Sequence, residues 1–414
     1  MRYIRRLSFF CVAMLAMAVG GFIADGGGQA LAAQGQLLAT QPICGATITA
    51  DTMLGSDLTN CPVDGIVIGA DNITLDLNGH TIDGDATPGP DNDDAGIRIV
   101  GHHGVTIEGG IVQEFVHAVV LDSASGNLVR RLTAVTNGRG ILLQNGSDGN
   151  VIEDNDTSHN GRASIVLFDS DSNVIRHNTM SGNGANGFRG VNANHNRLES
   201  NLVANNGFTG LVLTQSNDNR IDANVVSGNS EAGIIVDEGS RNTVTRNHVF
   251  RNPGDIILNG DDNIVTGNLV TDALACDNGE GCGIGISVEG GAHNLVAANV
   301  VARTVHSGIR LDAYGLPVIG NVFRDNVVRA AGTDGIAIDV AQVGSVLDTV
   351  LDSNVTLGAS DDGIDVDSPA TTLTRNIAVD NGDLGIEAVA GVIDGGGNHA
   401  GGNGNPAQCI NIAC

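Results

Sequence analysis

The sequence predicts an all-β fold, a single right-handed parallel β-helix of about fourteen coils, and three observations support it. Asparagines recur at a spacing of 23 residues. Between them lie short apolar runs, such as 233–236 and 243–245, that alternate in polarity with period two. These runs are too short and too rich in asparagine for helices. Each repeat therefore holds about three short strands, which pair in parallel with those of the next repeat at about 4.8 Å.

The repeat is defined by three columns of asparagine that keep one register. They span Asn127 to Asn242, 137–252 and 155–247, each in steps of 23. Asparagine tolerates a left-handed backbone, and its amide can hydrogen-bond to the asparagine of the next coil. We therefore expect these residues at the turns, joined by side-chain ladders.

Apolar columns accompany the asparagines and are expected to point inwards as the core. An outward apolar stripe is expected to be covered by a loop or a partner. The inward columns are Ile141, Ile165, Leu211, Ile234, Ile256, Ile309, Ile336 and Ile364; Ile152, Ile175, Leu198, Ile221 and Val244; and Met180, Val203, Val226 and Val249. The outward stripe is Leu142, Val166, Val212, Ile235 and Ile257.

The strict spacing ends after residue 253. Asparagine pairs continue at 263/268, 294/299 and 321/326, in steps of 21, 31 and 27. The extra residues are expected to leave the coils as loops near 272–282, 314–318 and 343–350. Because binding sites on solenoids are usually built from such insertions, the functional end is predicted between residues 270 and 390.

The two ends of the chain are expected to differ from the coils. Residues 1–33 combine early arginines, an apolar run and Ala30-Leu31-Ala32, the layout of a secretory signal peptide. An N-terminal cap is predicted over 34–62, the β-helix over 63–400 and a C-terminal tail over 401–414. Three disulfides are predicted, because the remaining cysteines form three local pairs in an exported chain. The pairs are Cys44/Cys61, Cys276/Cys282 and Cys409/Cys414.

Composition excludes several classes of function. All 20 basic residues are arginine, so a lysine Schiff base is excluded. The formal net charge is −27, which opposes a nucleic-acid partner, an anionic membrane surface or a polyuronate bound without a cation. We expect a monomer that binds neither nucleic acid nor, after signal cleavage, a membrane.

Segments at both ends resemble secreted bacterial β-helix repeat proteins of the pectate-lyase-like superfamily. They are Cys44-Gly-Ala-Thr-Ile-Thr-Ala-Asp51, the run from Asn72 to Ile82, and the closing 402–409. This resemblance implies the fold, while the superfamily includes lyases, hydrolases, epimerases and adhesins.

Individual motifs of that superfamily are only partly present. Gly332-Thr-Asp334-Gly335 and Ser360-Asp361-Asp362-Gly363 resemble two of the four polygalacturonase motifs. Gly-His-Gly, Arg-Ile-Lys and the Asp-Pro-His of alginate epimerases do not occur. The repeat also resembles copper-associated periplasmic β-helix proteins. However, the histidines at 159, 177 and 195 step by 18 instead of 23, so no metal–histidine site is predicted.

Acidic residues concentrate in the later coils. Residues 300–390 hold 13 acids and 5 arginines, whereas 187–253 hold 6 of each. Asp312, Asp339 and Asp367 each lie four residues after a coil-opening glycine, and Asp334 and Asp362 each precede one. Carboxylates stacked about 5 Å apart repel, so they require a cation, a raised pKa or an arginine. The alternative is that Asp-Gly serves only as exposed turn chemistry.

We therefore predict an exported protein that binds extracellular polysaccharide on the outer face of residues 300–390. If it is an enzyme, a uronate lyase or a glycoside hydrolase, Asp334, Asp361 and Asp362 are the expected acid–base groups, and Arg310 holds a substrate carboxylate. The one cofactor indicated is Ca²⁺. Its expected ligands are Asp312, Asp339, Asp365 and Asp367. The alternative is a non-catalytic structural or surface-adhesion protein.

Overall fold

The structure is a computed structural model that describes residues 39–86, 93–275, 282–313, 318–340 and 346–414. All regular elements in these ranges are β-strands, and consecutive coils pair their strands in parallel. Within the same ranges, no helix offers an apolar span of membrane-crossing length. The predicted signal peptide, Cys276 and much of the three predicted loops lie outside the described residues.

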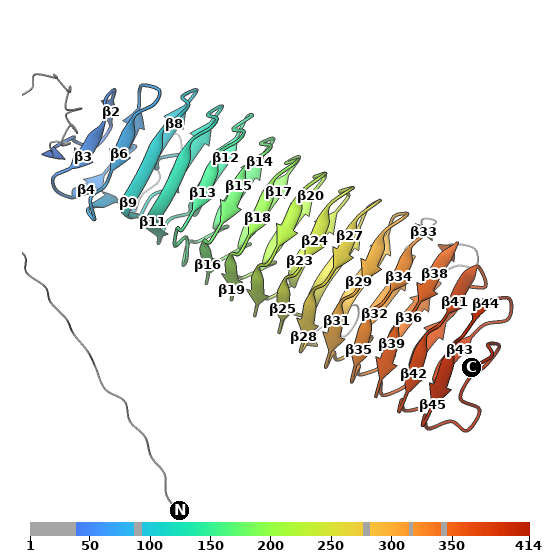
Figure 1. Ribbon diagram of the computed structural model, residues 1–414. Coiled ribbons are helices and arrows are strands. Elements are labelled where there is room, and N and C mark those ends of the chain that lie inside the picture. The colour runs from blue at the N-terminus through green and yellow to red at the C-terminus, as the bar shows by residue number, and fades with distance from the viewer. Residues whose placement is uncertain (1–38, 87–92, 276–281, 314–317, 341–345) are drawn as a thin grey trace, which may run out of the picture. The chain divides into compact units, whose positions relative to one another are not determined.

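Three long sheets run along the solenoid, which confirms the parallel β-helix (Figure 1). The first, called here the front sheet, has fifteen strands, so there are about fifteen coils where the sequence predicts about fourteen. Its strands are β2 (Ala46–Ile48), β5 (Ile66–Ile68), β8 (Ala95–Val100), β10 (His117–Asp122), β12 (Arg139–Gln144), β14 (Ile165–Phe168), β17 (Phe188–Val191), β20 (Leu211–Thr214), β23 (Ala232–Asp237), β26 (Gly254–Asn259), β29 (Ile284–Gly290), β32 (Ile309–Asp312), β36 (Ile336–Asp339), β40 (Ile364–Val366) and β43 (Ile386–Ala388).

The second sheet has eighteen strands, and its long members β9 and β11 span two sides of a coil. Its strands are β1 (Ala39–Thr40), β3 (Thr52–Leu54), β4 (Leu58–Cys61), β6 (Thr74–Asp76), β7 (Thr81–Gly84), β9 (Thr106–Gln113), β11 (Leu128–Val135), β13 (Val151–Glu153), β15 (Val174–Arg176), β18 (Arg197–Glu199), β21 (Arg220–Asp222), β24 (Thr243–Thr245), β27 (Ile264–Thr266), β30 (Leu295–Ala297), β34 (Val322–Arg324), β38 (Thr349–Asp352), β41 (Thr371–Thr374) and β44 (Ile393–Gly396).

The third sheet has ten strands and covers the remaining side of the later coils, and a small two-stranded sheet lies beside them. The ten are β16 (Thr179–Ser181), β19 (Leu202–Ala204), β22 (Val225–Ser227), β25 (His248–Phe250), β28 (Leu269–Thr271), β31 (Val300–Ala302), β35 (Val327–Arg329), β39 (Val355–Leu357), β42 (Ile377–Val379) and β45 (His399–Gly401). The two are β33 (Val318–Ile319) and β37 (Val346–Leu347).

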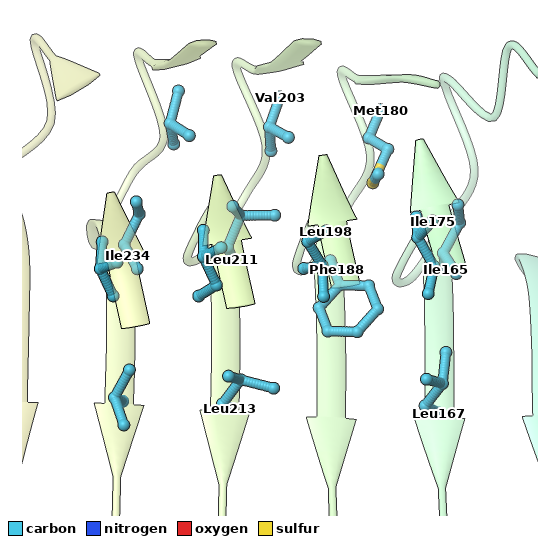
Figure 2. Close-up of a cluster of buried hydrophobic side chains, with 14 of the residues drawn as sticks. Ile165, Leu167, Ile175, Met180, Phe188, Leu198, Val203, Leu211, Leu213 and Ile234 are labelled. Atoms are coloured by element: carbon cyan, nitrogen blue, oxygen red, sulfur yellow. The ribbon is translucent and has the colours of Figure 1, made fainter. Parts of the chain in front are cut away.

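The core lies inside the coils, where the predicted inward columns are buried. Ile165, Phe188, Leu211 and Ile234 occupy successive register positions of the front sheet and are fully buried. Figure 2 shows them with Leu198 and Val203, which come from the other two sheets. Side chains of each coil stack on those of the next, so apolar burial is continuous along the solenoid and stabilises each coil only through its neighbours.

The asparagine columns form the predicted hydrogen-bonded ladders. Asn201 Oδ1 accepts from the backbone NH and the side-chain amide of Asn178, at 3.0 and 3.2 Å. Asn201 in turn donates from the same two groups to Asn224 Oδ1, each at 2.9 Å, and also to the Ile175 carbonyl. Because these asparagines are buried, each ladder satisfies backbone groups that water cannot reach.

The expectation that the ladder asparagines themselves adopt the left-handed backbone is wrong. The residue before each of them does so in the column that begins at Asn155: Asp154, His177 and Ser200 have φ of 55°, 55° and 54°. These residues are exposed. A left-handed residue turns the chain with its own side chain outside, which leaves the next side chain free to point inwards. Asparagine is selected here for its amide more than for its backbone.

Two predicted disulfides are confirmed in the described part of the chain. Cys44 pairs with Cys61, and Cys409 pairs with Cys414. They close loops at the two ends of the solenoid, with sequence separations of 17 and 5. Disulfides are typical of oxidising compartments.

Candidate functional site

The outward positions of the front sheet change in character along the solenoid. One register column runs through Val120, Leu142 and Val166, then through exposed Arg189 and half-buried Val212, Ile235 and Ile257, and its later positions include charged residues. Of the predicted apolar stripe, Leu142 and Val166 are buried and form a second apolar cluster with Val120, Ala95 and Ala163. Val212, Ile235 and Ile257 are only half-buried, so the expected cover is present at the first two positions of the stripe. The final positions of the column are Ser287, Arg310, Ala337, Asp365 and Glu387.

The last coils carry the acidic cluster, defined as Asp334, Asp339, Asp361, Asp362, Asp365, Asp367, Asp383 and Glu387. In each of three groups within it, one carboxylate oxygen per residue lies within 4.8 Å of the others. The groups are Asp339/Asp365/Asp367, Asp361/Asp362/Asp383 and Asp362/Asp365/Glu387. Asp362 and Asp365 each belong to two groups, so they link the residues predicted for catalysis to those predicted for a metal.

Asp362 is the most enclosed member of the cluster. Its side chain belongs to the turn before β40, and the residue is 5% exposed. Its Oδ1 accepts from the Leu384 backbone NH at 2.7 Å, while its own NH donates to Asp334 Oδ1 at 3.2 Å. Burial, together with Glu387 and Asp361, raises the pKa of Asp362 to about 7 despite the Leu384 hydrogen bond.

Asp365 has a similar pKa for a similar reason. Burial raises the pKa of Asp365 to about 7, and the nearby carboxylates of Asp367, Asp334 and Glu387 add to the effect. Burial also raises the pKa of Asp334. The cluster therefore holds carboxyl groups that are partly protonated near neutral pH beside other carboxylates, the condition required of an acid–base pair.

Arg310 is bound by two carboxylates. Asp312 and Asp339 are register partners, as the stacking of their glycines predicts. Arg310 Nη2 lies 2.7 Å from Asp312 Oδ2, and its Nε lies 2.5 Å from Asp339 Oδ2. The arginine opposes the rise that burial produces in the pKa of Asp339. The repulsion expected in this column is therefore relieved in part by a guanidinium.

The predicted site residues make different kinds of contact. Asp339, Asp365 and Asp367 converge as one group of potential ligands, whereas Asp312 faces Arg310. Asp361 and Asp362 converge, and Asp334 touches them through the Asp362 backbone NH.

Sequence reasoning missed Asp383 and Glu387, although the signal for both was present. Glu387 lies two residues after Gly385, as Asp365 does after Gly363, and the two are register partners. Asp383 likewise precedes Gly385 by two residues, the position that Asp361 occupies before Gly363. Extending the glycine register by one coil finds both.

This arrangement supports two kinds of chemistry. Carboxylate oxygens within 4.8 Å of one another suit a hard cation such as Ca²⁺, which accepts several oxygen ligands. Without a cation, the same crowding retains protons on Asp362 and Asp365 near neutral pH, and a retained proton can be donated to a glycosidic oxygen.

Solved structures share the fold. A variant of the periplasmic alginate epimerase AlgG is 13% identical, with a TM-score of 0.50, and the match covers 80% of this chain and 77% of that one. The A-module of the Azotobacter vinelandii mannuronan C-5 epimerase AlgE4 is 15% identical, with a TM-score of 0.44 and coverage of 80% and 91%.

A GH87 α-1,3-glucanase catalytic domain with bound tetrasaccharides is 14% identical, with a TM-score of 0.47 and coverage of 90% of this chain and 62% of that one. A comparison with curated proteins gave no match. The family described as "Periplasmic copper-binding protein (NosD)" matches residues 66–231 and 205–340. Because these two matches together span more than half of the sequence, the chain belongs to the NosD family.

Proposed function

We propose that this chain is an exported β-helix protein that binds a polysaccharide over the acidic cluster and acts on it by acid–base chemistry. The observation that carries the proposal is a pair of carboxyl groups, Asp362 and Asp365. Both have pKa values of about 7, and both belong to one group of converging carboxylates. The two disulfides favour an oxidising compartment, in keeping with export.

In this proposal Asp362 is the proton donor. At neutral pH part of its population is protonated, and Asp361 and Asp383 converge on it as potential bases. Arg310 holds Asp312 and Asp339 in place, and a uronate carboxylate that reached the guanidinium would compete with them. The periplasmic alginate epimerase named above has the same fold.

The residues do not fit copper, although the family description names it. Copper in proteins favours imidazole, thiolate and thioether ligands. Each group of potential ligands in the described ranges consists of carboxylates alone, and Met180 is fully buried in the core. A second candidate function is therefore binding of Ca²⁺ by Asp339, Asp365 and Asp367, which a hard cation would favour.

The test is a panel of neutral and uronate-containing polysaccharides, with and without Ca²⁺, assayed for binding, for new reducing ends and for unsaturated products. We expect binding, and we expect Asp362→Asn to lower activity by about 100-fold or more, the usual contribution of a general acid. Asp154→Asn is the matched control, because Asp154 is an exposed acid on a regular coil.

Three results would count against the proposal in different ways. Full activity in Asp362→Asn would show that another group transfers the proton. Binding without any product would show that the protein binds the polysaccharide but does not act on it. No binding across the panel under either condition would favour the structural or adhesion alternative.

A further inference from the structure

A second site lies on the front sheet, far from the acidic cluster. A hollow of about 650 Å³ is lined by Asp93, Glu114, His117, Arg139, His159 and Arg162, together with backbone and apolar groups. A smaller hollow of about 140 Å³ shares Arg139 and Arg162 with it and adds Arg189. The strands concerned, β10 to β17, lie about eight positions along the sheet from β36 and β40, roughly 40 Å at 4.8 Å per strand.

The front sheet and the turn before β14 bring the three arginines to the same hollow. Arg139 is the register partner of His117, and Arg189 is the partner of Val166. Arg162 enters from the turn before β14, where its backbone NH donates to the Gly138 carbonyl at 2.7 Å. The smaller hollow also contains Ala163 and Phe168, so its floor is apolar. Arg189 lies 5.8 Å from the centre of the Phe168 ring, a cation–π contact that holds its guanidinium at the hollow.

These arginines form no direct ion pair in the described part of the chain, although the charge of Asp93 acts on Arg139 from a distance. Most other described arginines pair with a carboxylate, as Arg241 does with Asp218. Among the described residues, no carboxylate oxygen lies within 4.0 Å of a guanidinium nitrogen of Arg139, Arg162 or Arg189. Burial lowers the pKa of Arg139, and the positive charges of Arg162 and Arg189 lower it further. Three guanidiniums grouped beside one hollow, in a protein of formal charge −27, favour the binding of an anion there.

The larger hollow provides polar groups of another kind. Asp93 and Glu114 are exposed and can accept hydroxyl hydrogen bonds. His117 is 3% exposed, its Nε2 lies 3.2 Å from Asp93 Oδ1, and its Nδ1 has no hydrogen-bond partner among the residues that the structure describes. Burial and Arg139 lower the pKa of His117 to about 4, so the imidazole is neutral at pH 7 and adds no repulsion toward the arginines.

We propose that the smaller hollow binds the oxyanion of an acidic oligosaccharide, between Arg139, Arg162 and Arg189, with the sugar ring and its hydroxyl groups in the larger hollow. Guanidinium forks match a carboxylate or a sulfate, and the adjoining volume accommodates more than an inorganic ion. The site uses no residue of the acidic cluster. This proposal can therefore be tested independently of the proposed acid–base function.

The experiment is isothermal titration calorimetry of the full chain at low ionic strength with trigalacturonate, neutral maltotriose and inorganic phosphate. We expect trigalacturonate to bind at least about tenfold more tightly than the other two. Arg162→Gln should weaken that binding by about tenfold or more. Arg329→Gln should change it by less than about twofold, because Arg329 is an exposed arginine of the third sheet with the same charge.

A thermal melt separates binding from folding. Removing one of three repelling guanidiniums should not lower the melting temperature, and Arg189→Gln repeats the test with a residue that is exposed. The proposal is overturned if trigalacturonate does not bind, if phosphate binds as tightly, or if Arg329→Gln weakens binding as much as Arg162→Gln. Loss of polysaccharide turnover in Asp362→Asn alone would leave this proposal intact.

Discussion

The regular coils of residues 127–253 and the acidic coils of residues 300–390 agree inside and differ outside. The first inward position of the front-sheet strands is equivalent in both regions, since Leu211 and Ile364 are fully buried there. Asn201 and Asn354 make the same ladder bonds to the next coil. Outside, acids and arginines balance in residues 187–253, whereas acids exceed arginines by 8 in the acidic coils, 13 against 5. The inner positions therefore stabilise the solenoid in both regions, and the outer positions are free to vary in charge.

The largest expected effect tests whether the inner positions are equivalent. Asn201→Ala and Asn354→Ala should each lower the free energy of unfolding by roughly 2–4 kcal/mol, because each leaves buried hydrogen-bonding groups of its neighbours unpaired. Urea unfolding followed by far-ultraviolet circular dichroism measures this. A much smaller effect of Asn354→Ala would contradict the equivalence of the inner positions, because it would show that the acidic coils depend less on the ladder.

The next effect concerns the residue at the boundary between the two kinds of coil. Asp255 is fully buried and accepts from the side-chain amide of Asn252 at 2.9 Å, at the end of the asparagine column that spans 137–252. Its Oδ2 has no hydrogen-bond partner within the described ranges, and burial raises the pKa of Asp255 to about 7. Stability from this group is complete below its ordinary pKa of 3.8 and is lost as the pH rises through about 7.

Asp255→Asn should therefore stabilise the protein at about pH 8 by on the order of 1–3 kcal/mol, and much less at about pH 5. Thermal melts at the two pH values give the comparison, with Asp154→Asn as the control on a regular coil. An equal effect at both pH values would mean that Asp255 does not titrate in this range.

A smaller pH effect should separate the acidic coils from the regular ones. Because the pKa values of Asp362 and Asp365 are raised to about 7, their contribution to stability is present at acidic pH and is lost as the pH rises through neutrality. We expect Asp362→Asn/Asp365→Asn to reduce the fall in melting temperature between about pH 5 and about pH 8. Ca²⁺ should raise the melting temperature of the wild type at the higher pH and should do less for the double variant. An unchanged pH profile would contradict the raised pKa values.

The smallest effect compares an arginine from each region. Arg241 forms an exposed pair with Asp218, and Arg241→Gln should leave the melting temperature unchanged within error. Arg310 is half-buried and is held by Asp312 and Asp339, so Arg310→Gln should lower the melting temperature by a small amount at neutral pH. Equal shifts for the two variants would show that Arg310 contributes no more than a surface pair.

Most of the fold could be predicted from the sequence because the inner positions repeat. The spacing of 23 residues fixes which side chains stack, so the buried columns and the ladders follow from the positions of Ile165 and Asn178 alone. The left-handed positions were predicted one residue too late. Asp154 and His177 share the left-handed conformation but are different residue types, so the sequence shows no common signal for it.

The candidate site could be predicted only in part. Glycine positions aligned Asp312 with Asp339, because both follow a coil-opening glycine by four residues. Which carboxylates converge depends on side-chain direction and burial, and these are set by packing between coils. The basic hollows were missed although Arg139 and Arg162 are 23 residues apart, each two residues after a ladder asparagine. The spacing does not show that Arg189 and Asp93 lie beside the same hollows, because that depends on side-chain packing.

The C-terminal tail has a consequence for assembly. Asn403 ends one ladder by donating its side-chain amide to Gln408 Oε1 at 2.9 Å, and the Ile410 NH pairs with the Ile386 carbonyl on β43, the final strand of the front sheet. An open solenoid end is a strand edge on which another copy could continue the stack. The tail occupies that edge, and the Cys409–Cys414 disulfide holds it there. It therefore blocks the final strand of the front sheet against addition of a strand from another copy.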